Sequence, residues 1–156
     1  MNTRKGLELL LVAGLVVFGG WVLSWSSRPK EPSPGSLSVV LGGDFYAGER
    51  LREYGVTENP EDFVRGFPED LRTADLHLVN LEAPITTRSD TVTEKTYWLR
   101  NHPDVAMPLL RRLSVDGVSL ANNHILDYGL RGLLETTHRL DGAGIRYAGV
   151  GGSASG

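Results

Sequence analysis

The feature that most constrains the fold is a regular alternation of short apolar runs and helix-like segments after residue 36. Apolar runs occur at 37–41, 76–81, 115–121 and 145–149. The segments between them show helical apolar spacing or the signals that start a helix. Such alternation is typical of βαβ units, whose right-handed crossovers build a parallel sheet with helices on its faces. We therefore predict an α/β fold with a largely parallel sheet for residues 37–156.

Local signals mark where the helices should begin. The sequence Asn-Pro-Glu-Asp at 59–62 supplies an N-cap, a proline at the first helical position and acids in the first turn. Gly66 and Pro68 interrupt the pattern that follows, so two short helices are expected there. Further helices are predicted around 105–113 and 130–140 because apolar residues recur there at helical spacing.

Glycine, proline and polar segments refine these boundaries. Pro108 is compatible with its predicted helix only near the first turn, because a later proline removes a backbone hydrogen bond. Gly142 and Gly144 are placed to end the last helix. The polar segments at 49–58 and 83–100 are long enough to be functional loops, although ordinary surface loops are the more common outcome.

The longest apolar run lies near the N-terminus. Residues 9–25 carry no charge, and with residues 7 and 8 they approach the ~20 residues that cross ~30 Å of hydrocarbon. Two tryptophans at the far end suit the membrane–water interface. We predict a cytoplasmic tail at 1–6, a single transmembrane signal anchor at 7–25 and, at 26–36, an extended proline- and serine-rich linker.

Two alternatives to a retained anchor stay open. A buried core helix is the weaker one, because the run is apolar on all faces and a linker follows it. A cleaved signal peptide is the stronger one, but Ser-Trp-Ser-Ser at 24–27 offers no small-x-small cleavage site. Two basic residues precede the run and two follow it, so the flanking charges do not fix its orientation.

Composition excludes several classes of function. The formal net charge of the chain is −3. The first 36 residues contain four basic and two acidic residues, a net charge of +2, so the remaining 120 residues carry −5. An acidic domain is a poor nucleic-acid binder, and no nucleic-acid partner is expected. The chain has no cysteine, which excludes disulfides and thiolate metal sites. Any metal ligands must then be oxygen atoms and imidazole nitrogens.

Three of the predicted strands end in polar residues. The first ends at Asp44, the second at Asn80 and Glu82, and the third at 122–124, Asn-Asn-His. Ligand sites in open α/β sheets lie beyond the carboxyl ends of the strands, so these groups should lie together. Carboxylates, amide oxygens and an imidazole suit a divalent cation such as Mn²⁺, Zn²⁺, Fe²⁺ or Mg²⁺. Such an ion would polarise a scissile bond and acidify a bound water.

Each of these residues also has a structural interpretation. Asp44 after Gly-Gly would cap a turn, and Glu82 would be a solvated loop acid. Asn122 tolerates a left-handed backbone, and we expect it to serve structure. Asp127 is expected to cap the helix that follows it. The remaining histidines show no ligand spacing and are interpreted as structural: His77, His102 and His138.

The segment Glu-Lys-Thr-Tyr-Trp-Leu-Arg at 94–100 offers two cations. Lys95 and Arg100 would bind an anionic group of a substrate. The usual alternative for such residues is a solvated basic pair on the surface.

Several short motifs belong to one pattern. They are Gly43-Asp44, Asn80-Leu81-Glu82 followed by Pro84, the Lys95 region and, most specific, Ser-Leu-Ala-Asn-Asn-His-Ile-Leu-Asp-Tyr-Gly at 119–129. With these motifs the chain resembles the CapA family of capsule (poly-γ-glutamate) synthesis proteins. The resemblance runs from about residue 37 to the end of the chain.

The resemblance carries implications for fold and site. The family is related to calcineurin-like metallophosphoesterases, whose four-layer α/β fold holds metal ligands at strand ends. By resemblance, Asp44, Glu82 and Asn123 are metal ligands and His124 assists chemistry at the substrate. The sequence departs from the phosphoesterase pattern at Asp44-Phe45-Tyr46, where an Asp-x-His would supply an imidazole. A dinuclear centre is therefore in doubt.

The resemblance also implies a function. The first hypothesis is a single-pass cell-membrane protein with its domain on the extracytoplasmic side, which acts in capsule or poly-γ-glutamate synthesis or export through a metal-dependent hydrolase-like site. Its expected partners are the membrane, capsule synthase subunits and an anionic polymer. The second hypothesis is a non-catalytic scaffold that binds polymer or synthase. Family members continue beyond the last glycine turn, so residues 37–156 are expected to be the N-terminal part of the domain, inactive alone and with an apolar sheet face left uncovered.

Overall fold

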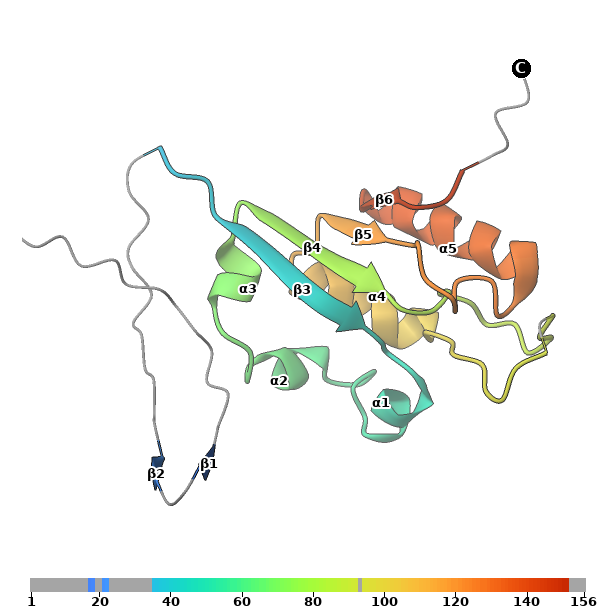
Figure 1. Cartoon of the computed structure of the whole chain (residues 1–156), viewed down its shortest axis with the longest axis horizontal. Helices are drawn as coiled ribbons and strands as arrows, with labels where there is room; N and C mark the ends of the chain where they lie inside the picture. Colours follow the sequence, from blue (N-terminus) through green and yellow to red (C-terminus); the bar gives the residue numbers. More distant parts are fainter. Residues whose placement is uncertain (1–16, 19–20, 23–34, 93, 152–156) are drawn as a thin grey trace, which may run out of the picture. The chain divides into compact units, whose positions relative to one another are not determined.

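The computed structural model describes residues 17–18, 21–22, 35–92 and 94–151 (Figure 1). The chain divides into two compact units, 1–36 and 37–156.

In the first unit, the described residues form two short strands. The strands β1 (Val17–Phe18) and β2 (Trp21–Val22) pair antiparallel, where the sequence predicts part of a helix. The rest of the predicted anchor, the tail at 1–6 and nearly all of the linker lie outside the described residues. Among the residues that are described, no helix has the length and apolar character needed to cross a membrane.

The second unit is built on a four-stranded parallel sheet. Its strands are β3 (Val39–Phe45), β4 (Leu76–Leu81), β5 (Gly117–Ser119) and β6 (Arg146–Ala148). They lie side by side in chain order, and each neighbouring pair is parallel. The predicted α/β class with a parallel sheet is confirmed.

The first strand runs further than the sequence predicts. Gly42-Gly43 is interpreted above as the turn that ends it, but β3 continues through both glycines to Phe45. Its register with β4 shifts between Leu41 and Asp44. A Cβ at Gly42 would lie 2.8 Å from a methyl of Val79, so the close approach of the two strands requires glycine. The shift places Asp44 opposite Asn80 within the sheet.

The helices begin largely where local signals predict. The sequence break at Gly66 and Pro68 separates α2 (Pro60–Val64) from α3 (Asp70–Thr73). Asn59 is the N-cap of α2, and its side-chain oxygen accepts a hydrogen bond from the Asp62 amide at 3.4 Å. The longer helices are α4 (Pro103–Arg112) and α5 (Gly129–Ala143), and Gly144 ends α5 in a left-handed conformation with φ 72°.

Three local predictions were wrong. The polar segment at 49–58 contains a short helix, α1 (Glu49–Glu53), whose exposed polar surface gives no apolar periodicity to detect. Pro108 lies in the interior of α4, because that helix begins at Pro103, two residues before the predicted start. Gly142 lies inside α5 and does not end it.

The core lies on one face of the sheet. Leu81 and Val118 point from the sheet into a buried cluster with residues of α4 and α5 such as Leu109 and Leu140. Figure 1 shows α4 behind the strands. These contacts position the carboxyl ends of β3, β4 and β5 at one edge.

The opposite face of the sheet is open. Leu41, Leu78, Gly117 and Arg146 are in register across the four strands and line a shallow, mostly apolar groove of about 380 Å³. Leu41 is 76% exposed, which is unusual for a residue inside a strand of a parallel sheet. The described residues of the second unit therefore form one sheet with helices on one face, and the four-layer arrangement stays a prediction.

Candidate functional site

The acidic residues at the ends of β3 and β4 converge on one amide. Asn80 of β4 donates its side-chain N–H groups to Asp44 Oδ1 at 2.8 Å and to Glu82 Oε2 at 2.6 Å. The bulge in β3 makes this arrangement, because it brings Asp44 opposite Asn80. The carboxylates of Asp44 and Glu82 are thus both held by the amide group of Asn80.

Asn122 joins this cluster to the third strand end. Its side-chain N–H₂ donates to Asn80 Oδ1 at 3.2 Å and to the Leu81 carbonyl at 2.8 Å. Its side-chain oxygen accepts a hydrogen bond from the His124 amide at 3.1 Å. Among the described non-glycine residues only Ser114 has a positive φ, so Asn122 does not serve a left-handed turn. Its structural role is to link Asn80 with His124.

His124 is paired with a buried carboxylate. Its Nδ1 lies 2.7 Å from Asp127 Oδ2, and both side chains are buried. The interpretation of Asp127 as a helix cap was wrong: the N-cap of α5 is Tyr128, which makes no side-chain cap hydrogen bond. Asp127 instead accepts hydrogen bonds from the Leu99 amide at 2.9 Å and from Lys95 Nζ.

The surroundings of Asp127 decide its charge. Burial opposes ionisation, but the hydrogen bonds from Lys95, Leu99 and His124 outweigh burial and hold the pKa of Asp127 below its usual range. A carboxylate can only accept, so His124 Nδ1 carries the proton in this pair. In the neutral ring, Nε2 then has a free lone pair, as in a general base or a metal ligand.

The loop from 83 to 100 covers this pair. Lys95 Nζ donates to the Asn123 carbonyl oxygen as well as to Asp127, and the Tyr97 ring stacks on His124 with centroids 5.6 Å apart. Asn123 is exposed and lies directly between Asn122 and His124 in this network. The sequence predicts that Lys95 binds a substrate. In the structure its ammonium group is hydrogen-bonded to Asn123 and Asp127.

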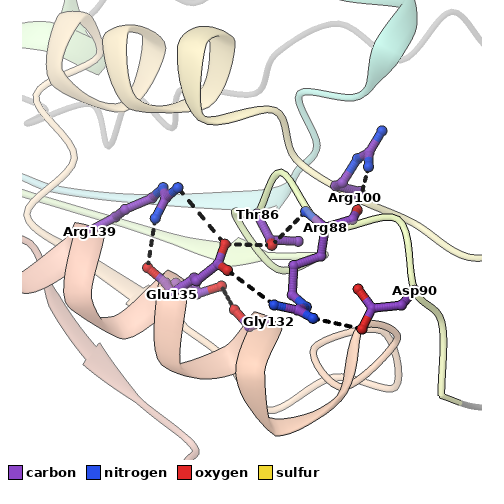
Figure 2. A network of polar contacts seen from close by, with 8 residues as sticks. Thr86, Arg88, Asp90, Arg100, Gly132, Glu135 and Arg139 are labelled. Carbon is purple, nitrogen blue, oxygen red and sulfur yellow. Dashed lines mark hydrogen bonds and ion pairs between the residues drawn. The ribbon is translucent and has the colours of Figure 1, made fainter.

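Arg100 has different contacts. It donates to the Arg88 carbonyl, lies 3.7 Å from Glu49 Oε2, and stands over the Tyr128 ring at 5.7 Å from the centroid. Figure 2 shows Arg100 beside Arg88. These neighbours are those of a residue that anchors a loop, and its contact with a substrate stays a prediction.

A polar network fixes the same loop to α5. Glu135 accepts a hydrogen bond from Thr86 at 2.7 Å and lies 3.7 Å from an Arg88 nitrogen (Figure 2). Arg88 also pairs with Asp90 at 2.7 Å. The buried Asn101 side chain closes the loop base, accepting from the Ala47 amide and donating to the Ala83 carbonyl. These contacts hold residues 95–99 over His124.

The described residues fit a metal only in part. Asp44 and Glu82 lie close enough to share one amide group, and two carboxylates are suitable ligands for a hard or borderline cation. Within 35–92 and 94–151, however, no group of three or more His, Cys, Asp or Glu side chains is arranged to hold a metal ion. Direct metal coordination by Asp44, Glu82 and Asn123 stays a prediction.

The chain matches a known protein family over most of its length. The model of a protein family described as "Bacterial capsule synthesis protein PGA_cap" matches residues 38–155. The chain belongs to this family. The match covers all four strands of the parallel sheet and the whole network from Asp44 to Asp127, and it confirms the resemblance to capsule synthesis proteins.

Two relatives in Mycobacterium tuberculosis, from strains CDC 1551 and H37Rv, carry the name "Probable polyglutamine synthesis accessory protein". Each is 44% identical over 77 residues, which are 49% of this chain and 20% of the relative. An uncharacterized protein of Sinorhizobium fredii is 39% identical over 88 residues, 53% of this chain and 19% of its own length. The chain spans about a fifth of the length of these relatives.

Part of this residue cluster was expected from the sequence. The three strand ends and His124 were identified, and the structure connects Asp44, Glu82 and His124 through Asn80 and Asn122. The sequence did not predict that Asn80 joins Asp44 to Glu82. Its place in the sequence after Asp44 and two residues before Glu82 was a usable signal. Neither the role of Asp127 nor the stacking of Tyr97 could be found, since both depend on how a long loop folds back.

Proposed function

We propose that the chain is a membrane-anchored, extracytoplasmic component of capsule or poly-γ-glutamate synthesis or export. The family match over residues 38–155 is the observation that carries this proposal. The uncharged run at 9–25 and the proline-rich linker after it support a single-pass anchor in the cell membrane. The acidic domain then works outside the membrane, where the polymer is assembled or released.

Its partners are capsule synthase subunits and the anionic polymer. The M. tuberculosis relatives are named as accessory proteins, which supports association with a synthesis machinery here. The domain is acidic overall, so contact with an anionic polymer has to be local, near cations such as Lys95 and Arg100.

The strand-end cluster is the proposed site of chemistry. Asp44 and Glu82, with Asn123, would hold a divalent cation, either Mn²⁺, Zn²⁺, Fe²⁺ or Mg²⁺, and the bound ion would supply Lewis acidity for hydrolysis. His124 would exchange a proton with the substrate through Nε2, because Nδ1 is engaged with Asp127. Two carboxylates and an amide oxygen are a weak donor set, so low affinity is expected for this chain by itself.

A non-catalytic scaffold is the second candidate, and one observation favours it. The N–H₂ group of Asn80 lies between Asp44 and Glu82 and satisfies both carboxylates without a cation. Asn122 holds the Asn80 oxygen on the other side, so the amide cannot turn over without losing that hydrogen bond. In this function the cluster would only fix the edge of the sheet that a partner contacts.

Equilibrium dialysis of the full-length chain against Mn²⁺ and Zn²⁺ separates the two candidates. The enzyme proposal predicts weak binding of about one ion per chain, abolished in the Asp44→Asn/Glu82→Gln double variant. The variant Glu94→Gln, an exposed acid on the nearby loop, is the control and should bind as the wild type does. Equal binding by the wild type and the double variant would reject the metal site and leave the scaffold.

A further inference from the structure

Asp127 is the point where three separate parts of the site meet. One of its oxygens accepts from Lys95, and the other accepts from the Leu99 amide and contacts His124 Nδ1 at 2.7 Å. Its own backbone carbonyl accepts from the Val92 amide at 3.3 Å. The loop that carries Val92, Lys95 and Leu99 therefore docks on the residue that also holds His124.

This arrangement differs from an ordinary surface ion pair. The Asp127 side chain is fully buried, while the Lys95 side chain is 26% exposed. A buried carboxylate that loses its donors carries a large desolvation cost, so the loop and Asp127 stabilise one another's positions. The Tyr97 ring adds to this by stacking on His124 at an interplanar angle of 29°.

We propose that Asp127 is a positioning residue that fixes the tautomer of His124 and links that tautomer to the docking of Val92, Lys95 and Leu99. With Lys95 and Leu99 in place, both carboxylate oxygens of Asp127 accept hydrogen bonds. Because a carboxylate cannot donate, His124 Nδ1 must be the donor in its contact with Asp127. The nitrogen available to a substrate is then Nε2. If the loop lifts away, Asp127 loses two of its donors and His124 loses the Tyr97 ring.

The link has a direct functional consequence, which rests on the function proposed above. His124 would be correctly prepared for proton exchange only while the loop is docked. Asp127 itself would act on the substrate only through His124.

The nitrogen spectrum of the histidine ring tests this directly. The full-length chain, labelled at histidine and kept in detergent micelles without metal, is measured at a pH where the ring is neutral, and Gln substitution at 124 assigns the signals. The wild type should show a proton on Nδ1 of His124. In Asp127→Ala the ring should move toward the tautomer distribution of free imidazole. A wild-type proton on Nε2, or an unchanged tautomer in the variant, overturns the proposal.

Hydrogen exchange tests the link to the loop without relying on that variant. Lys95→Met should speed exchange of the Leu99 amide by about tenfold, the change expected when one charge-assisted hydrogen bond is lost. Lys95→Arg should restore slow exchange, and Glu94→Gln should leave it unchanged. Unaltered Leu99 exchange in Lys95→Met would show that the loop is held independently of Asp127. A failure to bind metal would reject the proposed chemistry and leave these readouts intact.

Discussion

At the scale of single residues, the amide side chains organise this domain. Asn80 and Asn122 connect three strand ends through both their oxygen and nitrogen atoms. Asn101 does the same for the long loop, where its oxygen lies 2.5 Å from the Ala47 amide and its nitrogen 2.6 Å from the Ala83 carbonyl. An amide can donate and accept at once, so one side chain satisfies two backbone groups that water cannot reach.

Asn101→Ala should therefore be strongly destabilising. It leaves a buried N–H and a buried C=O without partners, and each such loss costs about 1–3 kcal/mol, so a total of about 2–6 kcal/mol is expected. Denaturant unfolding of wild type and variant measures this cost. Asn59→Ala, which removes only an exposed helix cap, should cost about 1 kcal/mol or less. Equal costs for the two variants would contradict this account of the loop base.

The sequence could not supply this level of detail. Polar residues after strands were enough to find Asp44, Glu82 and His124, because parallel strands put their carboxyl ends at one edge. The partners of Lys95 depend on the path of an 18-residue loop with no helix or strand among its described residues, and sequence patterns carry little information about such paths. The same limit hid the pairing of Lys95 with the buried Asp127.

At the scale of elements, hydrogen bonds in both directions between Ser38 and Asp75 fix the start of β3 to the start of β4. Asp75 Oδ2 accepts from the Ser38 amide at 2.8 Å and from its hydroxyl at 2.6 Å, while the Asp75 amide donates to the Ser38 hydroxyl at 2.9 Å. The hydrogen bonds from the Ser38 side chain and backbone hold the pKa of Asp75 below its ordinary value of 3.8. These hydrogen bonds fix the register at the start of the two strands. The bulge further along β3 then places Asp44 opposite Asn80.

The lowered pKa of Asp75 has a testable consequence. An acid whose pKa is depressed in the folded state adds stability above its unfolded pKa, and this contribution is lost as pH falls through the folded value. The protection factor of the Ser38 amide, which is the exchange rate of an unprotected amide at the same pH divided by that of Ser38, should stay high at pH 5 to 7 and fall only at a pH below 3.8. In Asp75→Asn the protection factor should be lower near neutral pH and should lose this acid-dependent fall. A wild-type loss of protection centred near neutral pH would contradict the assignment.

Two glycines near the end of α5 offer a matched pair of substitutions. Gly142 has open space around its Cα and lies within the helix, whereas Gly144 is left-handed with φ 72°. Gly142→Ala should stabilise the domain by about 0.5–1 kcal/mol. Gly144→Ala should destabilise it by about 1–2 kcal/mol, because a side chain disfavours that conformation. Thermal unfolding of the two variants should shift in opposite directions, and shifts in the same direction would contradict these helix boundaries.

At the scale of the whole molecule, the domain has one closed face and one open face. The alternation of apolar runs and helical segments was sufficient to predict the parallel sheet. It did not predict that β3 lies at an edge with Leu41 76% exposed, because a short apolar run looks the same in a buried strand. That a further part of a longer protein covers this face stays a prediction.

Stability measurements can tell whether this face stays open in the isolated chain. Leu41→Ser should change the free energy of unfolding by less than about 0.5 kcal/mol, as surface substitutions usually do. Leu81→Ala removes a fully buried side chain on the covered face and should cost about 2–5 kcal/mol. A cost at Leu41 comparable to that at Leu81 would show that something covers the open face.

The amount of capsule polymer on the cell surface tests the central claim most directly. In the bacterium that carries this gene, deletion should abolish surface γ-glutamyl polymer, and the wild-type gene should restore it. His124→Gln, checked for normal folding and abundance, should restore less than about a tenth, since positioned acid–base groups contribute at least that much to rate. Full restoration by His124→Gln would reject the catalytic role and favour the scaffold. Unchanged surface polymer in the deletion strain would contradict the proposed function altogether.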